Sequence, residues 1–126
     1  MEFLAAGPRG PLARNHIESP GELVTPDIVL AEVARVLARQ GMDSDRIAGH
    51  LRSIGALSTV LSVTVEIALE TIHAAGDLRH RARSRGLDQP SFSDAIILAF
   101  ARCMHGSVLT ADKHFEGLPE ATWIGN

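Results

Sequence analysis

At 126 residues, 45% of them hydrophobic, the chain is long enough to bury one globular core and too short for two domains, so we expect a single domain over residues 1–126. It contains no apolar run long enough to span a bilayer, and its one cysteine excludes an internal disulfide, so the reducing cytoplasm is the expected location. One Trp, four Phe and no Tyr are too few aromatic side chains for a base-stacking platform.

The formal net charge of −3 does not by itself predict a polyanion partner, but the charges are unevenly distributed. One group of arginines without intervening acids stands in an otherwise acidic chain: Arg79, Arg81, Arg83 and Arg85. Such a strip favours contact with a polyanion at one edge of the molecule. A solvated helix face is the alternative interpretation.

The chain opens with Glu2–Ala6, which predicts a helix although no capping residue or strand precedes it. The short apolar run over residues 22–25 predicts the end of a strand. Thr25 and Pro26 are a typical N-cap and first residue of a helix. Apolar residues then recur at helical spacing until Gly41, which predicts the end of that helix.

Beyond Gly41 helices and strands continue to alternate, and this predicts an α/β fold with a parallel sheet covered by helices on both faces. The uncharged, β-branched run Leu57–Val63 predicts a buried strand. Gly76 is expected to end a helix that begins at Thr64, and a separate arginine-rich helix follows up to Gly86. The other predicted elements are helices over 44–55 and 91–105 and strands over 107–110 and 122–124.

Several kinds of site are excluded because the sequence lacks their motifs. The sequence has no phosphate-binding loop, no dinucleotide-binding glycine motif, and neither H-E-x-x-H nor C-x-x-C. Its six histidines fall at no metal-ligand spacing, so zinc is not expected. Cys103 lies on the apolar helix near Phe100 and is expected in the core.

Three acidic residues near the ends of predicted elements are the remaining candidates for a functional site. Glu32 lies within an otherwise apolar helix, Asp94 lies in the first turn of another, and Asp112 follows the strand over 107–110 by two residues. Residues just past the carboxyl ends of parallel strands gather at one rim, where ligands bind. We therefore expect the three carboxylates to converge there.

Each acid also has a purely structural interpretation. Ser91-x-x-Asp94 is close to a capping box, so Asp94 could only satisfy amides at the start of a helix. Asp112 could cap the segment 113–117. Glu32 could pair with Arg35 or Arg39 on its own helix.

Three segments resemble the motifs of a known family. Val24–Val33 resembles the segment in which PIN domains deliver a glutamate from the first helix after strand two. Ser91–Ala99 resembles their S-x-x-D-A-x-I-x-A helix start, and Leu109–Phe115 resembles their closing L-(T/V)-(T/A)-x-D-x-x-F stretch. The motifs occur in family order and span nearly the whole chain, and the nearest group resembles the VapC-type toxins of prokaryotic toxin–antitoxin pairs.

The resemblance implies a three-layer α/β/α fold and an endoribonuclease that uses Mg²⁺ or Mn²⁺. By position, Glu32, Asp94 and Asp112 would be metal ligands, and Thr110 would hydrogen-bond to the cluster or to the substrate. The four arginines would contact RNA phosphates. A cognate antitoxin and a second copy of the chain are the implied protein partners.

In one respect the sequence departs from the family pattern. PIN domains begin with the central strand of their sheet, which ends in a ligand aspartate, whereas Met1–Leu4 matches the helix that normally follows that strand. The central strand and its aspartate are therefore expected to be missing, because the chain starts too late. Glu2 would be a poor substitute for this aspartate.

The acidic residues favour a hard cation on physical grounds as well. Two carboxylates about 5 Å apart repel each other by roughly 3 kcal/mol at an effective dielectric of ~20, so their clustering is favourable only around a cation. Oxygen ligands favour Mg²⁺ or Mn²⁺, which would activate water to attack a phosphodiester. The alternatives are a catalytically impaired PIN-fold module that binds an antitoxin or self-associates, and a plain α/β scaffold whose acids cap helices.

Overall fold

The computed structural model describes residues 2–4 and 23–124, and it contains five strands and four helices in this part of the chain. The predicted alternation of helices and strands is confirmed. In chain order the elements are β1 (Glu2–Leu4), β2 (Leu23–Pro26), α2 (Asp27–Arg39), α3 (Ser44–Leu57), β3 (Thr59–Leu61), α4 (Val65–Arg85), α5 (Phe92–Cys103), β4 (Ser107–Thr110) and β5 (Ala121–Trp123).

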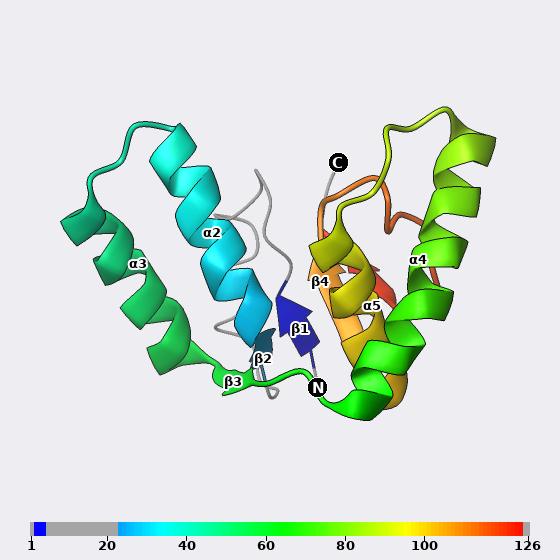
Figure 1. Ribbon diagram of the computed structural model, residues 1–126, viewed down its shortest axis with the longest axis horizontal. Helices are drawn as coiled ribbons and strands as arrows, with labels where there is room; N and C mark the ends of the chain where they lie inside the picture. Colours follow the sequence, from blue (N-terminus) through cyan, green and yellow to red (C-terminus); the bar gives the residue numbers. More distant parts are fainter. Residues whose placement is uncertain (1, 5–22, 125–126) are drawn as a thin grey trace.

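The strands form one parallel sheet in the order β3-β2-β1-β4-β5, so β1 is the central strand (Figure 1). Phe3 pairs with Val24 of β2 on one side and with Val108 of β4 on the other. The prediction of a helix from Glu2 is therefore wrong for residues 2–4, and so is the prediction that the central strand is missing. Pairing on both sides outweighs the weak helix preference of so short a segment.

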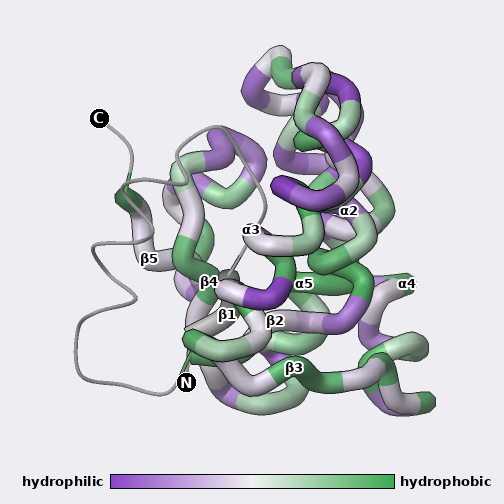
Figure 2. The backbone as a smooth tube through the Cα atoms, turned by 90° about the vertical axis from the view of Figure 1, so that its left-hand side faces the viewer, coloured by the Kyte–Doolittle hydropathy of each residue, from purple (hydrophilic) through white to green (hydrophobic). Residues whose placement is uncertain are grey.

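Alternate residues of the strands point to opposite faces of the sheet, and each face has its own core. On one face Val24 and Val108 pack with α4 and α5, whose residues Leu78, Ile97 and Phe100 are fully buried. On the other face lies a smaller core, formed by Leu23, Leu109, Ile54 of α3 and Ile124. Figure 1 shows α2 and α3 on one side of the sheet and α4 and α5 on the other, and Figure 2 shows the hydrophobic trace of α5. The predicted three-layer α/β/α arrangement is confirmed.

Two predicted elements differ from the structure in position or extent. α4 is one continuous helix, in which Gly76 is an interior residue, and the left-handed Gly86 (φ 64°) ends it. Burial of the α4 face that contains Ala74, Leu78 and Ala82 outweighs the helix-breaking tendency of one glycine. The predicted buried strand over 57–63 is the short edge strand β3, and its Val60 is exposed.

Smaller differences concern side chains at the ends of elements. Pro26 ends β2 and takes the N-cap position of α2. The Thr25 hydroxyl, predicted to cap that helix, lies 2.7 Å from the Ser58 hydroxyl instead. Cys103 is exposed at the end of α5, so its predicted burial is wrong. Among the described residues no helix is both long and apolar enough to cross a membrane.

Candidate metal centre

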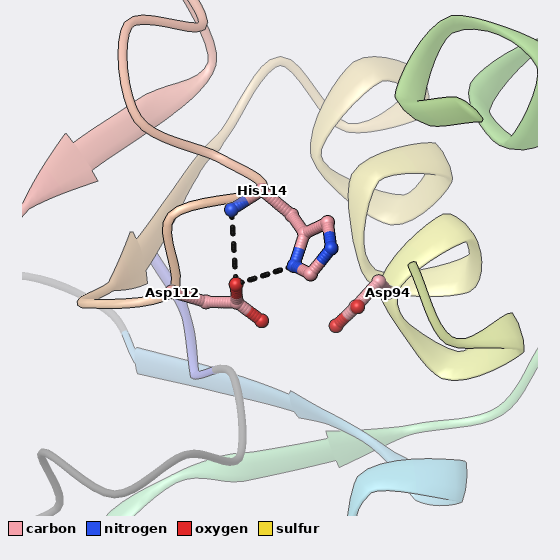
Figure 3. A group of neighbouring side chains, drawn as sticks. All are labelled: Asp94, Asp112 and His114. Atoms are coloured by element: carbon pink, nitrogen blue, oxygen red, sulfur yellow. Dashed lines mark hydrogen bonds and ion pairs between the residues drawn. The ribbon is translucent and has the colours of Figure 1, made fainter. Parts of the chain in front are cut away.

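Two carboxylates from distant parts of the chain meet at the carboxyl edge of the sheet. Asp94 lies in the first turn of α5, and Asp112 follows β4 by two residues. One potential ligand atom of each of Asp94, Asp112 and His114 lies within 4.8 Å of the other two. In Figure 3 the two carboxylates point toward each other from the helix and from the loop after β4, with the imidazole beside them.

Asp94 is held by a capping box at the start of α5. Its Oδ2 accepts a hydrogen bond from the Ser91 amide at 3.0 Å, and the Ser91 hydroxyl accepts one from the Asp94 amide at 3.1 Å. The structural interpretation of Asp94 is therefore correct, because its carboxylate caps α5 through Oδ2.

Burial raises the pKa of Asp94 above the usual value of an aspartate, and the negative charge of Asp112 adds to the rise. The hydrogen bonds from Ser91 act in the opposite direction without cancelling it. Only 7% of Asp94 is exposed. An anionic Asp94 is thus held in an environment that opposes its charge, and a bound cation would relieve this cost.

Asp112 is oriented by its neighbours on the loop. The buried Thr110 hydroxyl accepts a hydrogen bond from the Asp112 amide at 2.9 Å. Oδ1 of Asp112 accepts from the His114 amide at 2.9 Å and lies 2.7 Å from His114 Nδ1. No described residue donates to Oδ2 of Asp112. The predicted local capping by Asp112 thus also occurs, again through one oxygen only.

His114 is the member of this centre that the sequence did not predict. Its ring lies between Asp112 and the carbonyl oxygen of Asp88, which is 2.7 Å from Nε2. Burial alone lowers the pKa of His114, but the hydrogen bonds to Asp88 and Asp112 outweigh burial, and the pKa is raised above the usual value. The only signal in the sequence was the spacing Asp112-x-His114, which is too short and too common to indicate a site.

Glu32 lies close enough to this pair to interact with it electrostatically. It is half-buried on α2 and makes no ion pair or hydrogen bond with a described residue. Burial raises the pKa of Glu32, as do the negative charges of Asp94 and, less strongly, Asp112, whereas Arg35 lowers it. The structure therefore brings Asp94 and Asp112 together and places Glu32 beside them, outside the group of atoms within 4.8 Å.

The four arginines of α4 fall into two pairs, because residues two positions apart lie on nearly opposite sides of a helix. Arg81 and Arg85 donate hydrogen bonds to the carbonyl oxygen of Glu116 in the loop after Asp112. Arg79 and Arg83 are exposed and bind no described residue. The predicted single strip is thus two surfaces, one of which contacts the protein itself.

These oxygen donors fit a hard divalent cation. Asp94 and Asp112 offer carboxylate oxygens that face each other, and Glu32 offers a third carboxylate nearby. Both nitrogens of His114 are already engaged in hydrogen bonds, and the one cysteine, Cys103, is at the far end of α5. Carboxylate donors without free imidazole or thiolate favour Mg²⁺ or Mn²⁺ over zinc.

The fold agrees with the comparison with known families. The model of the PIN domain family matches residues 2–121 of the chain. The chain belongs to the PIN domain family. No curated protein matches it.

Solved structures of a VapC toxin and of toxin–antitoxin complexes are similar to this PIN domain. VapC20 of Mycobacterium tuberculosis, described as a toxin that cleaves the sarcin–ricin loop, is 21% identical, with a TM-score of 0.66 over 95% of this chain and 96% of that one. A toxin–antitoxin complex from Klebsiella pneumoniae is 21% identical, with a TM-score of 0.64 over 97% and 96%. VapBC2 of Rickettsia felis, bound to a promoter DNA fragment, is 15% identical, with a TM-score of 0.63 over 100% and 99%.

The PIN domain retains its first strand but has no aspartate after it. The sequence from Met1 to Glu22 contains no aspartate, and Leu4 of β1 is followed by Ala5 and Ala6, which lie outside the described residues. Glu2 pairs with Leu23 and Ser107, the first residues of their strands. Glu2 therefore lies at the amino edge of the sheet, opposite the edge that carries Asp112.

Proposed function

We propose that this PIN domain is an endoribonuclease that depends on Mg²⁺ or Mn²⁺ and acts as the toxin of a toxin–antitoxin pair. The observation that carries the proposal is the convergence of Asp94 and Asp112, whose carboxylates face each other with potential ligand atoms within 4.8 Å. Similarity to VapC20, described as cleaving the sarcin–ricin loop, supports RNA as the substrate class. We propose the cytoplasm as the location, because a chain with one cysteine forms no internal disulfide and needs no oxidising compartment.

Each residue of the centre has a proposed role. Asp94 and Asp112 would hold the cation directly, and Glu32 would bind it directly or through a water molecule. Thr110 would fix Asp112 through its amide. When bound, the cation supplies charge neutralisation at the phosphodiester and a water molecule of lowered pKa. The exposed Arg79 and Arg83 would contact RNA phosphates, which makes binding weaker as the salt concentration rises.

A catalytically impaired module that binds an antitoxin or self-associates is the second candidate. It is favoured by one observation: alanines follow β1 where the family resemblance implies a ligand aspartate. With one carboxylate fewer the centre would bind the cation more weakly. The two candidates therefore differ in metal affinity and in turnover.

Both candidates are tested by incubating the protein with a structured RNA and Mn²⁺ and comparing it with Asp94→Asn. The nuclease proposal predicts cleavage that needs Mn²⁺ and is lost in the variant, together with a melting temperature that rises with Mn²⁺ in the parent only. Equal cleavage by parent and variant would refute it. An increase in melting temperature without cleavage would favour the impaired module.

For the protein partners we propose a homodimer and a cognate antitoxin. Val65, Leu69 and Ile72 form an apolar face on the first half of α4, and they are 72%, 59% and 68% exposed. Such a face on one helix supports contact with a second copy of the chain. The antitoxin is supported by the similarity to a Klebsiella pneumoniae toxin–antitoxin complex.

Light scattering of the purified protein tests the dimer. The parent is expected to be dimeric, and Leu69→Glu with Ile72→Glu is expected to be monomeric at the same concentration, since a charge cannot be buried in that contact. A parent that is monomeric at every concentration would refute the dimer.

A further inference from the structure

A second group of contacts connects α4 to the segment that carries Asp112 and His114. Arg81 Nη2 and Arg85 Nη1 both donate to the carbonyl oxygen of Glu116, the latter at 2.8 Å. Arg85 Nη1 also lies 3.4 Å from the Lys113 carbonyl oxygen, and Arg85 Nη2 lies 3.3 Å from Glu116 Oε2. Two guanidinium groups thus converge on one short segment, residues 112–117, which we call the acidic loop.

Besides the arginines, the acidic loop is attached at Asp112, whose amide donates to the Thr110 hydroxyl, and at His114, whose Nε2 lies 2.7 Å from the Asp88 carbonyl oxygen. It is a run of turns stabilised by local bonds, from the Phe115 amide to the Asp112 carbonyl at 3.0 Å and from the Glu116 amide to the Lys113 carbonyl at 3.3 Å. The side chain of Phe115 is fully buried and fixes the middle of the loop. The arginines bind the carbonyls on either side of Phe115, where the loop has no strand to hold it.

Arg81 is poorly suited to bind RNA. It is half-buried, and its Nε is enclosed without a hydrogen-bond partner among the described residues. Its Nη2 lies 3.7 Å from the position of a β-carbon built on Gly117, whose φ of 85° turns the chain at the end of the acidic loop. The side chain is therefore enclosed by the loop that it binds, unlike the exposed Arg79 and Arg83 of the same helix.

We propose that Arg81 and Arg85 are positioning residues, which hold the acidic loop so that Asp112 meets Asp94 at cation-binding distance. This inference rests on the proposed metal centre and assigns these two arginines to it instead of to RNA. A carboxylate that must be placed to within a fraction of an ångström depends on such outer contacts, and their loss typically weakens metal binding about 10- to 100-fold.

Removing Arg81 and Arg85 should change metal affinity in opposite directions, depending on whether they position the loop or act only through their charge. Removing two positive charges near a cation site should strengthen cation binding, because repulsion is reduced. A positioning role predicts the opposite, weaker binding. Arg79→Gln with Arg83→Gln changes the net charge of the same helix equally and is the matched control.

The experiment compares the parent, Arg81→Gln with Arg85→Gln, and the control pair. Amide hydrogen exchange of the peptide spanning 112–118 is measured in EDTA, and Mn²⁺ affinity is measured by calorimetry well below the melting temperature. We expect the Arg81/Arg85 variant to exchange about tenfold faster in this peptide and to bind Mn²⁺ about tenfold or more weakly. The control pair should keep the parent exchange rate and bind Mn²⁺ no more weakly than the parent.

Unchanged or tighter Mn²⁺ binding by a folded Arg81/Arg85 variant would overturn the proposal, as would an equal weakening in the control pair. If the double variant does not fold, Arg81→Lys and Arg85→Lys replace it. Each lysine keeps the charge and loses the planar guanidinium with its several donors. A positioning role therefore predicts faster amide exchange in the acidic loop at unchanged charge. A parent without Mn²⁺ affinity would refute the proposed function, whereas exchange in EDTA still shows whether the arginines hold the loop.

Discussion

His114 binds Asp112 through one ring nitrogen while its other ring nitrogen faces the carbonyl oxygen of Asp88, each at 2.7 Å. A carboxylate and a carbonyl can only accept hydrogen bonds, so both contacts are satisfied together only when the imidazole is protonated on both nitrogens. When the ring is doubly protonated, the centre contains its own positive charge between the acidic loop and the connection from α4 to α5. This relationship gives the metal-free protein a definite dependence on pH.

Stability in EDTA should be greater in mild acid because of His114. Its pKa in the folded protein is raised above the ordinary 6.5, so the stabilisation is complete below that pH and is lost as the pH rises through the folded pKa. We expect the free energy of unfolding of the parent to exceed that of His114→Ala by about 1 kcal/mol more in mild acid than in mild base. Urea denaturation across this range measures the difference.

The matched control is His80→Ala, which removes an exposed histidine of α4. This variant accounts for the loss of a histidine side chain as such. A His114→Ala difference that is constant, or that grows with rising pH, would show that the ring is not held as an imidazolium.

Replacing Asp94 by asparagine should stabilise the metal-free protein at neutral pH. The raised pKa of Asp94 means that the folded state favours the neutral carboxyl, so the ionised group destabilises the fold as the pH rises above 3.8, its ordinary value. Asparagine keeps an oxygen for the Ser91 amide and removes the charge. We expect a gain in stability in EDTA, together with loss of the Mn²⁺ response.

Asp43→Asn is the control for Asp94→Asn, because Asp43 caps α3 through the Arg46 amide at an exposed position away from the carboxylates. It should change stability little in EDTA and leave the Mn²⁺ response intact. An Asp94→Asn protein less stable than the parent in EDTA would mean that the capping role dominates.

Asp94 and Asp112 could be predicted because the local sequence fixes their positions relative to a helix start and a strand end. Ser91-x-x-Asp94 marks the start of α5, and Asp112 stands two residues after a clear strand. Parallel strands deliver such residues to one edge irrespective of the rest of the chain. The position of Glu32 depends also on how α2 packs against α5. Glu32 lies beside Asp94 and Asp112 and outside the group of atoms within 4.8 Å.

What the sequence did not indicate depends on contacts between distant segments. Glu2–Leu4 has a local preference for helix, and only pairing with β2 and β4 makes it a strand. The roles of His114 and of Arg81 depend on partners 26 and 35 residues away. Charge patterning treats the arginines of α4 alike, because it takes no account of which helix face meets the acidic loop.

Thr110 should be important for stability through its hydroxyl and not its methyl group. The hydroxyl accepts the Asp112 amide at a position where only 3% of the threonine is exposed. Thr110→Val leaves that amide without its acceptor, which costs about 1 to 3 kcal/mol, whereas Thr110→Ser keeps the bond. Urea denaturation should therefore rank Val below Ser. Equal stability of the two variants would mean that the amide finds another acceptor.

Gly76→Ala should stabilise the protein, because α4 continues through this position. An added β-carbon would meet no atom within 4 Å, and alanine is favoured over glycine inside a helix by about 1 kcal/mol. Gly86→Ala is the matched control, since it has equal space but a φ of 64°, where alanine is strained. Urea denaturation should show a gain for the first variant and a loss for the second. A loss for Gly76→Ala would indicate that the chain bends at this glycine, as expected for two helices in place of one.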